Sequence, residues 1–505
     1  MGSGAVPTDA PQSQAGFVKA LTLVDATMLV AGSMIGSGIF IVSADIARTV
    51  DSPFWLLVAW VVTGLITMLG ALSLAELAAM FPRAGGQYVF LRESMGPLMG
   101  FLYGWTLFVV IQTGTIAAVA VAFARFLGVF LPALTAERFG WFPQADVCVA
   151  ALGCRDAATA IQLGLTPQRL VAVLSVWLLT AVNLRGVREG KAVQTTLTLA
   201  KTGALALIVV LGLLVGRNAT AVAANFQGAS FVGGVDFTGA FAIAFGAALV
   251  GSLFSSDAWL NVTFAASEVQ NPKRNLPLAL VLGTGLVTLL YVTANLAYLS
   301  ILPLRGSATG ATVLERGIQF ATQDRVGTAA AEIIFGPAGV AVMAVLILVS
   351  TFGCNNGLIL AGARVYYAMA RDGLFFRRTG TLNRNHVPAA ALVVQGVWTT
   401  LLCLTGTYGQ LLDYVIFAAL LFYVLTTAGL FLLRARRPDA ERPYRVVGYP
   451  VVPALYMLLC TAVAVTLLLA GKTRTQALSG LVVVLVGVPV YYAWRAASRP
   501  AVPAR

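Results

Sequence analysis

The sequence predicts an all-α polytopic membrane protein with 12 transmembrane helices. Of its 505 residues, 59% are hydrophobic and only 10% are charged, against about 25% charged in a soluble domain. Twelve apolar stretches are about as long as, or longer than, the roughly 20 residues with which a helix crosses a bilayer. They are residues 21–46, 54–80, 97–131, 168–186, 192–216, 237–266, 277–302, 333–368, 387–406, 409–433, 450–470 and 477–496. The first and the sixth are broken by glycine or small polar residues, which indicates backbone that unwinds within the membrane.

The distribution of charge predicts the orientation of these spans. An even number of spans places both termini on one side. With the termini in the cytoplasm, most of the 33 lysine and arginine residues fall on the cytoplasmic side, as the positive-inside rule requires. The net charge of +13 is thereby explained by topology, so we expect a lipid bilayer as the surroundings and no nucleic acid as a partner. The tails 1–20 and 497–505 are expected to be cytoplasmic, the first of them disordered.

The break in the first segment is residues 32–38, Gly-Ser-Met-Ile-Gly-Ser-Gly. Gly36, Ser37 and Gly38 leave N–H groups free at the start of a new half-helix, and these donors at a positive helix end suit a carboxylate. Close packing of helices through small residues explains the same motif equally well.

The break in the sixth segment is residues 255–259, Ser-Ser-Asp-Ala-Trp. Backbone carbonyls from Phe254 to Asp257 end a half-helix, and a negative helix end suits an ammonium group. One break for a carboxylate and one for an ammonium group describe a zwitterionic amino acid. Phe254 is then an apolar lid over the solute, or otherwise a packing aromatic. Asp257 is ionisable at mid-membrane and is therefore a functional candidate, although it could also cap the following half-helix.

Lys201 lies about ten residues into the fifth span. An ammonium group at this depth is costly and should face the protein interior. We expect it to take the place of a sodium ion and to bind carbonyls of the first break; a snorkelling lysine is the alternative, strained at half a span. Ser350 and Cys354, one turn apart in the eighth span, are expected to complete the polar lining opposite Lys201, unless they serve only as contacts between helices.

Two acidic residues lie near the cytoplasmic side. Glu76 is in the second span, and Glu268 follows the sixth. Each could form a gate ion pair or take a proton.

The cysteine and histidine residues limit which disulfides, metal sites and catalytic groups the chain can form. Cys148 and Cys154 share an outer loop, where a local disulfide is favoured over a free thiol or a bridge to a partner chain. The single histidine, His386, lies in a cytoplasmic loop. The sequence contains no metal-binding set and no nucleophile–base pair, so we expect no cofactor and no enzyme activity.

Several motifs together resemble the amino acid–polyamine–organocation (APC) superfamily, in particular the L-type amino acid transporter (LAT) branch and its bacterial relatives. The likeness covers about residues 17 to 495. The matching stretches are residues 36–40, 82–88 (Pro-Arg-Ala-Gly-Gly-Gln-Tyr), 254–259, 268 with 271–277, and 352–357 with 364 and 371–373.

The resemblance implies a LeuT-type fold with a 5+5 inverted repeat and with helices 1 and 6 broken. The repeats would be residues 21–216 and 237–433, followed by two further helices in 450–496. The family's motifs imply that Ser37 and Gly38 hold the carboxylate and that carbonyls of Met34, Phe254 and Asp257 receive the ammonium group. The full expected substrate-binding set is Met34, Ile35, Gly36, Ser37, Gly38, Phe254, Ser255, Ser256, Asp257, Leu260 and Asn261, with Phe254 and Trp259 as gating residues and Lys201, Gly36, Ser350 and Cys354 as the sodium-site substitute and coupling set.

The function implied is sodium-independent exchange of neutral L-amino acids by alternating access, in the plasma (inner) membrane of a bacterium. A proton-coupled symporter, a cationic amino acid or polyamine carrier, and a nutrient-sensing receptor are the alternatives. Many members carry asparagine where this chain has Leu260, with Asn261 next, so preference or affinity is expected to differ. Eukaryotic members bridge to a glycoprotein heavy subunit; a local Cys148–Cys154 bridge predicts that this chain needs none.

Overall fold

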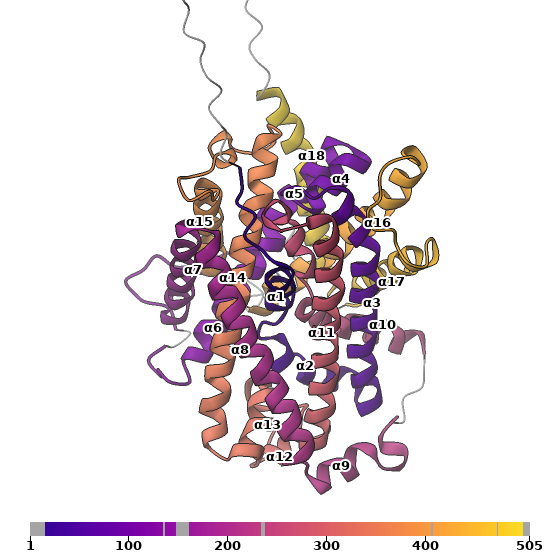
Figure 1. The fold of residues 1–505 in the computed structure, drawn as a ribbon. Coiled ribbons are helices and arrows are strands. Elements are labelled where there is room, and N and C mark those ends of the chain that lie inside the picture. Colours follow the sequence, from indigo (N-terminus) through magenta and orange to yellow (C-terminus); the bar gives the residue numbers. More distant parts are fainter. Residues whose placement is uncertain are drawn as a thin grey trace, which may run out of the picture.

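The helices pack side by side in one bundle (Figure 1). The computed structural model describes residues 16–134, 137–147, 161–233, 238–405, 408–471 and 473–497. Its helices are α1 (Leu23–Met34), α2 (Ser43–Val50), α3 (Pro53–Met80), α4 (Gln87–Met95), α5 (Pro97–Thr106), α6 (Gln112–Leu127), α7 (Pro167–Arg185), α8 (Val187–Leu214), α9 (Ala219–Phe226), α10 (Gly239–Ser255), α11 (Pro272–Ile301), α12 (Val313–Arg316), α13 (Val326–Phe335), α14 (Ala338–Arg371), α15 (Ala389–Thr405), α16 (Tyr408–Arg436), α17 (Val451–Leu469) and α18 (Arg474–Ala497).

Ten helical segments in the described ranges are long and apolar enough to cross a membrane. They coincide with ten of the twelve stretches expected from the sequence. The other two stretches form shorter pieces: residues 21–46 divide into α1, a 3-10 turn at Gly38–Phe40 and α2, whereas residues 387–406 form the 17-residue α15. The predicted all-helical spanning architecture is therefore confirmed in its coarse form.

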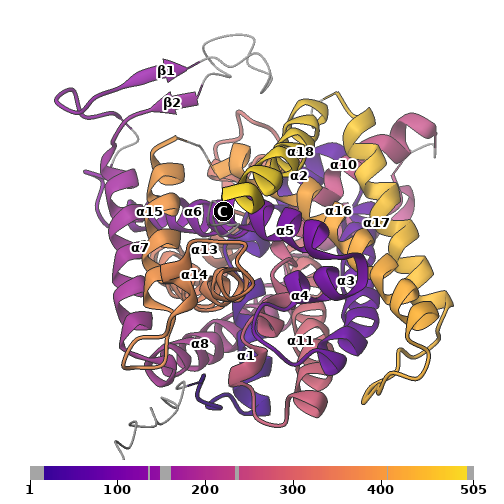
Figure 2. The ribbon, with the colours of Figure 1, turned by 90° about the horizontal axis from the view of Figure 1, so that it is seen from above.

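One small sheet lies outside the bundle. Strands β1 (Ala145–Val147) and β2 (Ile161–Leu163) pair antiparallel, with Asp146 opposite Gln162. The hairpin projects beyond the helices at the edge formed by α7 (Figure 2). It belongs to the long loop between α6 and α7, and sequence reasoning did not anticipate it.

Local sequence signals fix where α1 begins and which helix it meets. Thr22 and Asp25 form a capping box, in which each side chain accepts a hydrogen bond from the other's backbone N–H. The Asp25 carboxylate also accepts a hydrogen bond of 2.8 Å from Lys191 Nζ on α8. Because this ion pair joins α1 to α8 near one end, it helps to set the register at which Lys201 meets the first break.

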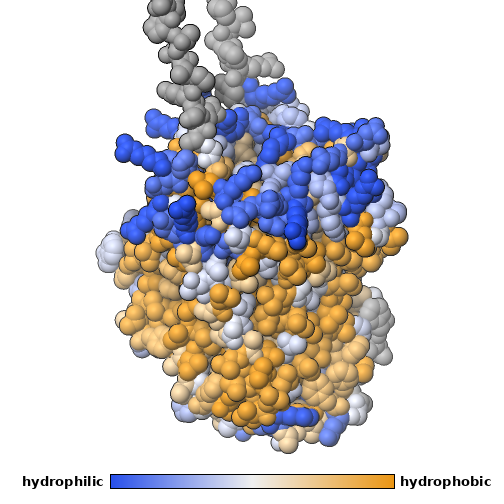
Figure 3. Space-filling view, in the orientation of Figure 1, coloured by the Kyte–Doolittle hydropathy of each residue, from blue (hydrophilic) through white to orange (hydrophobic). Residues whose placement is uncertain are grey.

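The outer surface is apolar around the bundle. Leu174 and Leu178 on α7 and Leu207 and Leu214 on α8 are each more than half exposed, an arrangement suited to lipid. Figure 3 shows hydrophobic residues over most of the face and hydrophilic residues at the end where the described chain begins and ends. With the ten candidate spans, this surface identifies a multi-pass membrane protein.

Candidate functional site

The first break has the geometry that its glycines predict. Helix α1 ends at Met34, Ile35 turns to extended backbone (φ −75°, ψ 97°), and helical structure resumes only at Gly38. Gly36, Ser37 and Gly38 are buried. The unwound backbone therefore lies inside the protein, where its free groups can be satisfied by other helices or by a solute.

The second break lies at the end of α10. Ser255 is the last residue of the helix, and Ala258 adopts a left-handed conformation (φ 65°) before a 3-10 turn over Trp259–Thr263. A left-handed alanine costs about 1–2 kcal/mol relative to a right-handed one, so the surrounding contacts must hold the chain in this path. Phe254 and Trp259, the predicted gating residues, are both buried.

The two breaks touch each other. A Cβ atom on Gly38 would lie 2.0 Å from Ser255 Oγ and 2.7 Å from Ser255 Cβ, so only glycine allows this approach. The Tyr291 hydroxyl on α11 lies 3.2 Å from the Met34 carbonyl oxygen and 3.0 Å from that of Ser255, so it can donate to either. Tyr291 was not anticipated from the sequence, since a tyrosine in an apolar span has no pattern that separates it from packing aromatics.

Lys201 binds the unwound backbone of the first break. Its Nζ donates to the carbonyl oxygens of Gly32 and Ile35, at 2.6 Å each, and of Ser350 on α14, at 3.3 Å. The side chain is 2% exposed, which excludes a snorkelling lysine. Three carbonyls around one buried ammonium group use all three of its donors.

Helix α14 supplies the second set of contacts to this backbone. Ser350 Oγ donates to the carbonyls of Ile35 and Gly36, at 3.2 and 2.8 Å. Cys354 Sγ lies 3.0 Å from the Ser33 carbonyl oxygen. Lys201, Ser350 and Cys354, on α8 and α14, thus bind four of the five carbonyls from Gly32 to Gly36.

Asp257 is paired with a tyrosine of α16. Tyr423 Oη donates a 2.5 Å hydrogen bond to Asp257 Oδ1, and the Tyr423 ring also packs against Trp259 at 5.5 Å between centroids. The 3-10 turn that follows begins at Trp259, after the N-cap residue Ala258, and has no side-chain cap hydrogen bond. Tyr423 was also missed by sequence reasoning, for the same reason as Tyr291.

A small cavity opens beside Asp257. Its lining brings Leu260 and Asn261 together with polar side chains of other helices, including Tyr103 and Gln112. The Asn261 amide nitrogen is buried and has no hydrogen-bond partner among the described residues, so it can donate to a group placed in this cavity. Ser256 lines a second cavity, which also borders Asp257.

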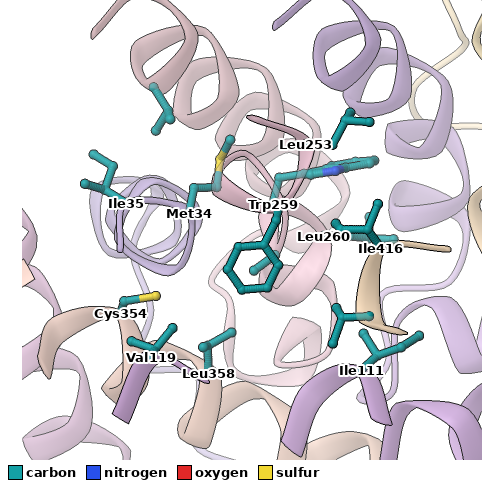
Figure 4. Packing of buried hydrophobic residues seen from close by; sticks show 14 of the residues in the cluster. Met34, Ile35, Ile111, Val119, Leu253, Trp259, Leu260, Cys354, Leu358 and Ile416 are labelled. Carbon is teal, nitrogen blue, oxygen red and sulfur yellow. The ribbon is translucent and has the colours of Figure 1, made fainter. Parts of the chain in front are cut away.

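Apolar side chains surround the meeting point of the breaks. Figure 4 shows them gathered from both breaks and from α6, α14 and α16, among them Met34, Ile35, Trp259, Leu260, Cys354, Leu358 and Ile416. The structure therefore brings the predicted residues of both breaks together with Lys201, Ser350 and Cys354. The predicted Cys148–Cys154 pair lies outside the described residues.

The two acidic residues that the sequence singled out, Glu76 and Glu268, are both paired with arginine. Glu268 and Arg364, both 1% exposed, form a bidentate pair at 3.0 and 3.2 Å. Glu76 is bound by Arg434 at 2.5 Å and accepts a hydrogen bond from the Val446 N–H at 2.8 Å. Of the two roles considered for them, the structure shows ion pairing.

Replacing Glu268 by alanine is expected to lower stability strongly. The buried Arg364 would lose its counter-ion, which typically costs about 3–5 kcal/mol. We expect a markedly lower melting temperature of the purified protein in detergent. Glu441, which pairs with Lys273 at the surface, is the matched control, because an exposed pair contributes at most about 1 kcal/mol. Equal melting temperatures for E268A and E441A would contradict this account of the pair.

Comparison with known proteins places this geometry in a family. A family model described as amino acid permease matches residues 21–489. The chain belongs to this amino acid permease family, within the APC superfamily. The permease is therefore an amino acid transporter and not an enzyme, as the sequence motifs predicted.

Three relatives illustrate the similarity. The permease is 30% identical to the b(0,+)-type amino acid transporter 1 of Rattus norvegicus, over 95% of this chain and 91% of the relative. It is 30% identical to the serine/threonine exchanger SteT of Bacillus subtilis, over 94% and 97% of the two chains. It is 31% identical to the large neutral amino acids transporter small subunit 2 of Homo sapiens, over 94% and 80%.

Proposed function

We propose that this permease is a sodium-independent exchanger of neutral L-amino acids that works by alternating access. The observation that carries the proposal is the position of Lys201. Its ammonium group is surrounded by the carbonyls of Gly32, Ile35 and Ser350, the kind of oxygen set that would otherwise coordinate a monovalent cation. A fixed positive charge there repels sodium, so transport needs no sodium ion.

The substrate is proposed to bind where the two breaks meet. Its carboxylate would accept hydrogen bonds from the backbone N–H groups of Gly36, Ser37 and Gly38, at the start of the second half-helix. Its ammonium group would bind carbonyls of Met34, Phe254 and Asp257. The contact between Gly38 and Ser255 supports this assignment, because it holds the donor break and the acceptor break next to each other.

The side chain of the substrate is proposed to enter the cavity beside Leu260 and Asn261. The unpaired Asn261 amide favours a neutral side chain that can accept a hydrogen bond. Leu260 adds apolar surface at the place where many relatives carry an amide. Tyr423 binds Oδ1 of Asp257, which leaves Oδ2 able to accept a further hydrogen bond; uptake of labelled L-arginine, below, therefore tests a cationic side chain.

Exchange rather than net uptake is proposed partly from the relatives, one of which is named as an exchanger. We further propose the full topology: twelve spans with both termini in the cytoplasm, inverted repeats at residues 21–216 and 237–433, and two more helices within 450–496. The permease would work in the plasma membrane without a heavy subunit, with Phe254 and Trp259 closing the site.

Reconstituted vesicles test the proposal. Proteoliposomes loaded with unlabelled L-serine are expected to take up labelled L-serine at least about tenfold faster than empty ones, and replacing external sodium by choline should leave the rate unchanged. Labelled L-leucine, L-arginine and putrescine in parallel define the substrate class. Equal uptake into empty vesicles under an inward proton gradient would establish the symporter instead, and a requirement for sodium would overturn the role given to Lys201.

A further inference from the structure

A second polar pocket lies beside α12 and α13, and its lining includes no residue of the two breaks. Its volume is about 140 Å³, partly open to solvent, which is enough for a small solute. Figure 1 places α12 and α13 at the end of the bundle opposite to the two ends of the described chain. With the termini in the cytoplasm, this is the outer end. The lining includes Arg316, Arg325, Thr328 and Glu332.

Two polar groups of this pocket have no hydrogen-bond partner in the described part of the chain, whereas Arg316 donates to Thr322 Oγ1 and to the Gly310 carbonyl oxygen. Arg325 Nε is buried without a hydrogen bond, and so is the hydroxyl of Thr328, a residue that is 9% exposed. No ion pair is formed by Arg325 or Glu332 among the described residues. Leaving buried donors unpaired costs free energy, so a bound group that satisfied them would be stabilised.

The three residues share one face of α13. Arg325 precedes the helix, and Thr328 and Glu332 follow at three and seven positions later, a spacing that lines up side chains along a helix. Arg325 and Glu332 therefore border the same space from opposite ends, a positive group at one end and a negative group at the other. These two charges are complementary to the carboxylate and the ammonium group of a zwitterion.

The surroundings of Arg325 favour an anion. Its guanidinium lies 4.9 Å from the centre of the Phe126 ring, which holds it in place. Burial lowers the pKa of Arg325, and the neighbouring Arg125 lowers it further. A carboxylate bound here would offset both effects, since it would supply the counter-charge that the described residues do not.

We propose that this pocket is a second binding site, at the outer mouth, for a small zwitterion whose carboxylate binds Arg325 and Thr328 and whose ammonium group binds Glu332. The position of this site at the outer mouth rests on the proposed topology, but the site does not depend on the assignment of Lys201 or of the two breaks. It would hold an amino acid at the outer face before the solute reaches the central site.

Thiol protection tests this site directly. Thr322 is exposed and lines the pocket, so T322C should react with a membrane-impermeant methanethiosulfonate reagent added outside right-side-out vesicles. L-serine is expected to slow this reaction at least about fivefold. L-serine methyl ester, which lacks the carboxylate, and L-lactate, which lacks the ammonium group, should not. The protein without T322C gives the background.

Paired variants separate this site from the central one. Protection by L-serine should be lost in T322C/R325Q and T322C/E332Q but kept in T322C/R305Q, because Arg305 pairs with Asp51 and does not line the pocket. Exchange measured on the same vesicles reports the proposed function independently. Protection that survives R325Q and E332Q, or no protection of T322C by L-serine, overturns the outer site whatever the exchange assay gives.

Discussion

Replacement of Lys201 by alanine is expected to reduce the exchange rate of the permease at least tenfold. The carbonyls of Gly32, Ile35 and Ser350 would lose their donor in a buried region. A hydrogen bond from a charged donor contributes about 1.5–3 kcal/mol, and a loss of about 1.4 kcal/mol already corresponds to a factor of ten. The unwound backbone would then relax away from the geometry that presents its N–H groups to a carboxylate. Initial rates of L-serine exchange in proteoliposomes, normalised to reconstituted protein, measure the effect.

A matched lysine variant controls for the loss of a charge. Lys273 pairs with Glu441 at the surface, so K273A should retain exchange within about twofold. K201R tests geometry rather than charge, because the larger planar guanidinium does not match three carbonyls around a compact ammonium group. We expect K201R to lose L-serine exchange as well. A K201A protein that exchanges L-serine at the rate of K273A would show that the lysine serves packing alone.

The sequence was most informative about residues whose presence within a membrane span costs free energy. Lys201 could be predicted to face the protein interior, because an ammonium group exposed to lipid at that depth has a higher free energy. The glycines of residues 32–38 could be predicted to break the helix for the same kind of reason. The roles of two tyrosines could not be predicted. Tyr291 on α11 contacts both breaks, and Tyr423 on α16 binds Asp257 of the second break. A tyrosine suits packing, an interface or a hydrogen bond equally well, so only the fold decides among these roles.

The outer pocket was missed for a related reason. Arg325 and Glu332 lie in a long loop of the sequence, where charged residues are ordinary and indicate only solvent exposure. Their significance depends on α13 packing into the bundle, where Gly327 meets Phe40 beyond the first break: a Cβ at Gly327 would lie 2.9 Å from that ring. Nothing in the spacing of residues predicts that a short loop helix will reach so deep. The hairpin of β1 and β2 was missed likewise, because three-residue strands carry too little pattern.

Substituting Gly38 by alanine is expected to abolish exchange, by an effect distinct from that of K201A. The new Cβ would lie 2.0 Å from Ser255 Oγ and 3.2 Å from Ser255 Cα. Side-chain rotation can move the hydroxyl but not Ser255 Cβ, which would lie 2.7 Å from the new Cβ. This contact forces the two breaks apart, so carboxylate and ammonium sites no longer match one solute. We expect at least a hundredfold lower kcat/KM for L-serine, about 2.7 kcal/mol in transition-state binding, with the protein still inserted and monodisperse in detergent.

Two further variants decide whether this clash is the cause. A Cβ atom on Gly203, in α8, would meet nothing within 4 Å among the described residues beyond the backbone of its own helix. G203A should therefore transport normally and melt at the same or a slightly higher temperature, since alanine favours a helix over glycine. S255G removes both side-chain atoms that G38A would meet, leaving only the 3.2 Å backbone contact. The double variant G38A/S255G should therefore recover at least tenfold of the lost activity. If G38A/S255G is as inactive as G38A, the loss comes from the carboxylate-binding backbone itself and not from the distance between the two breaks.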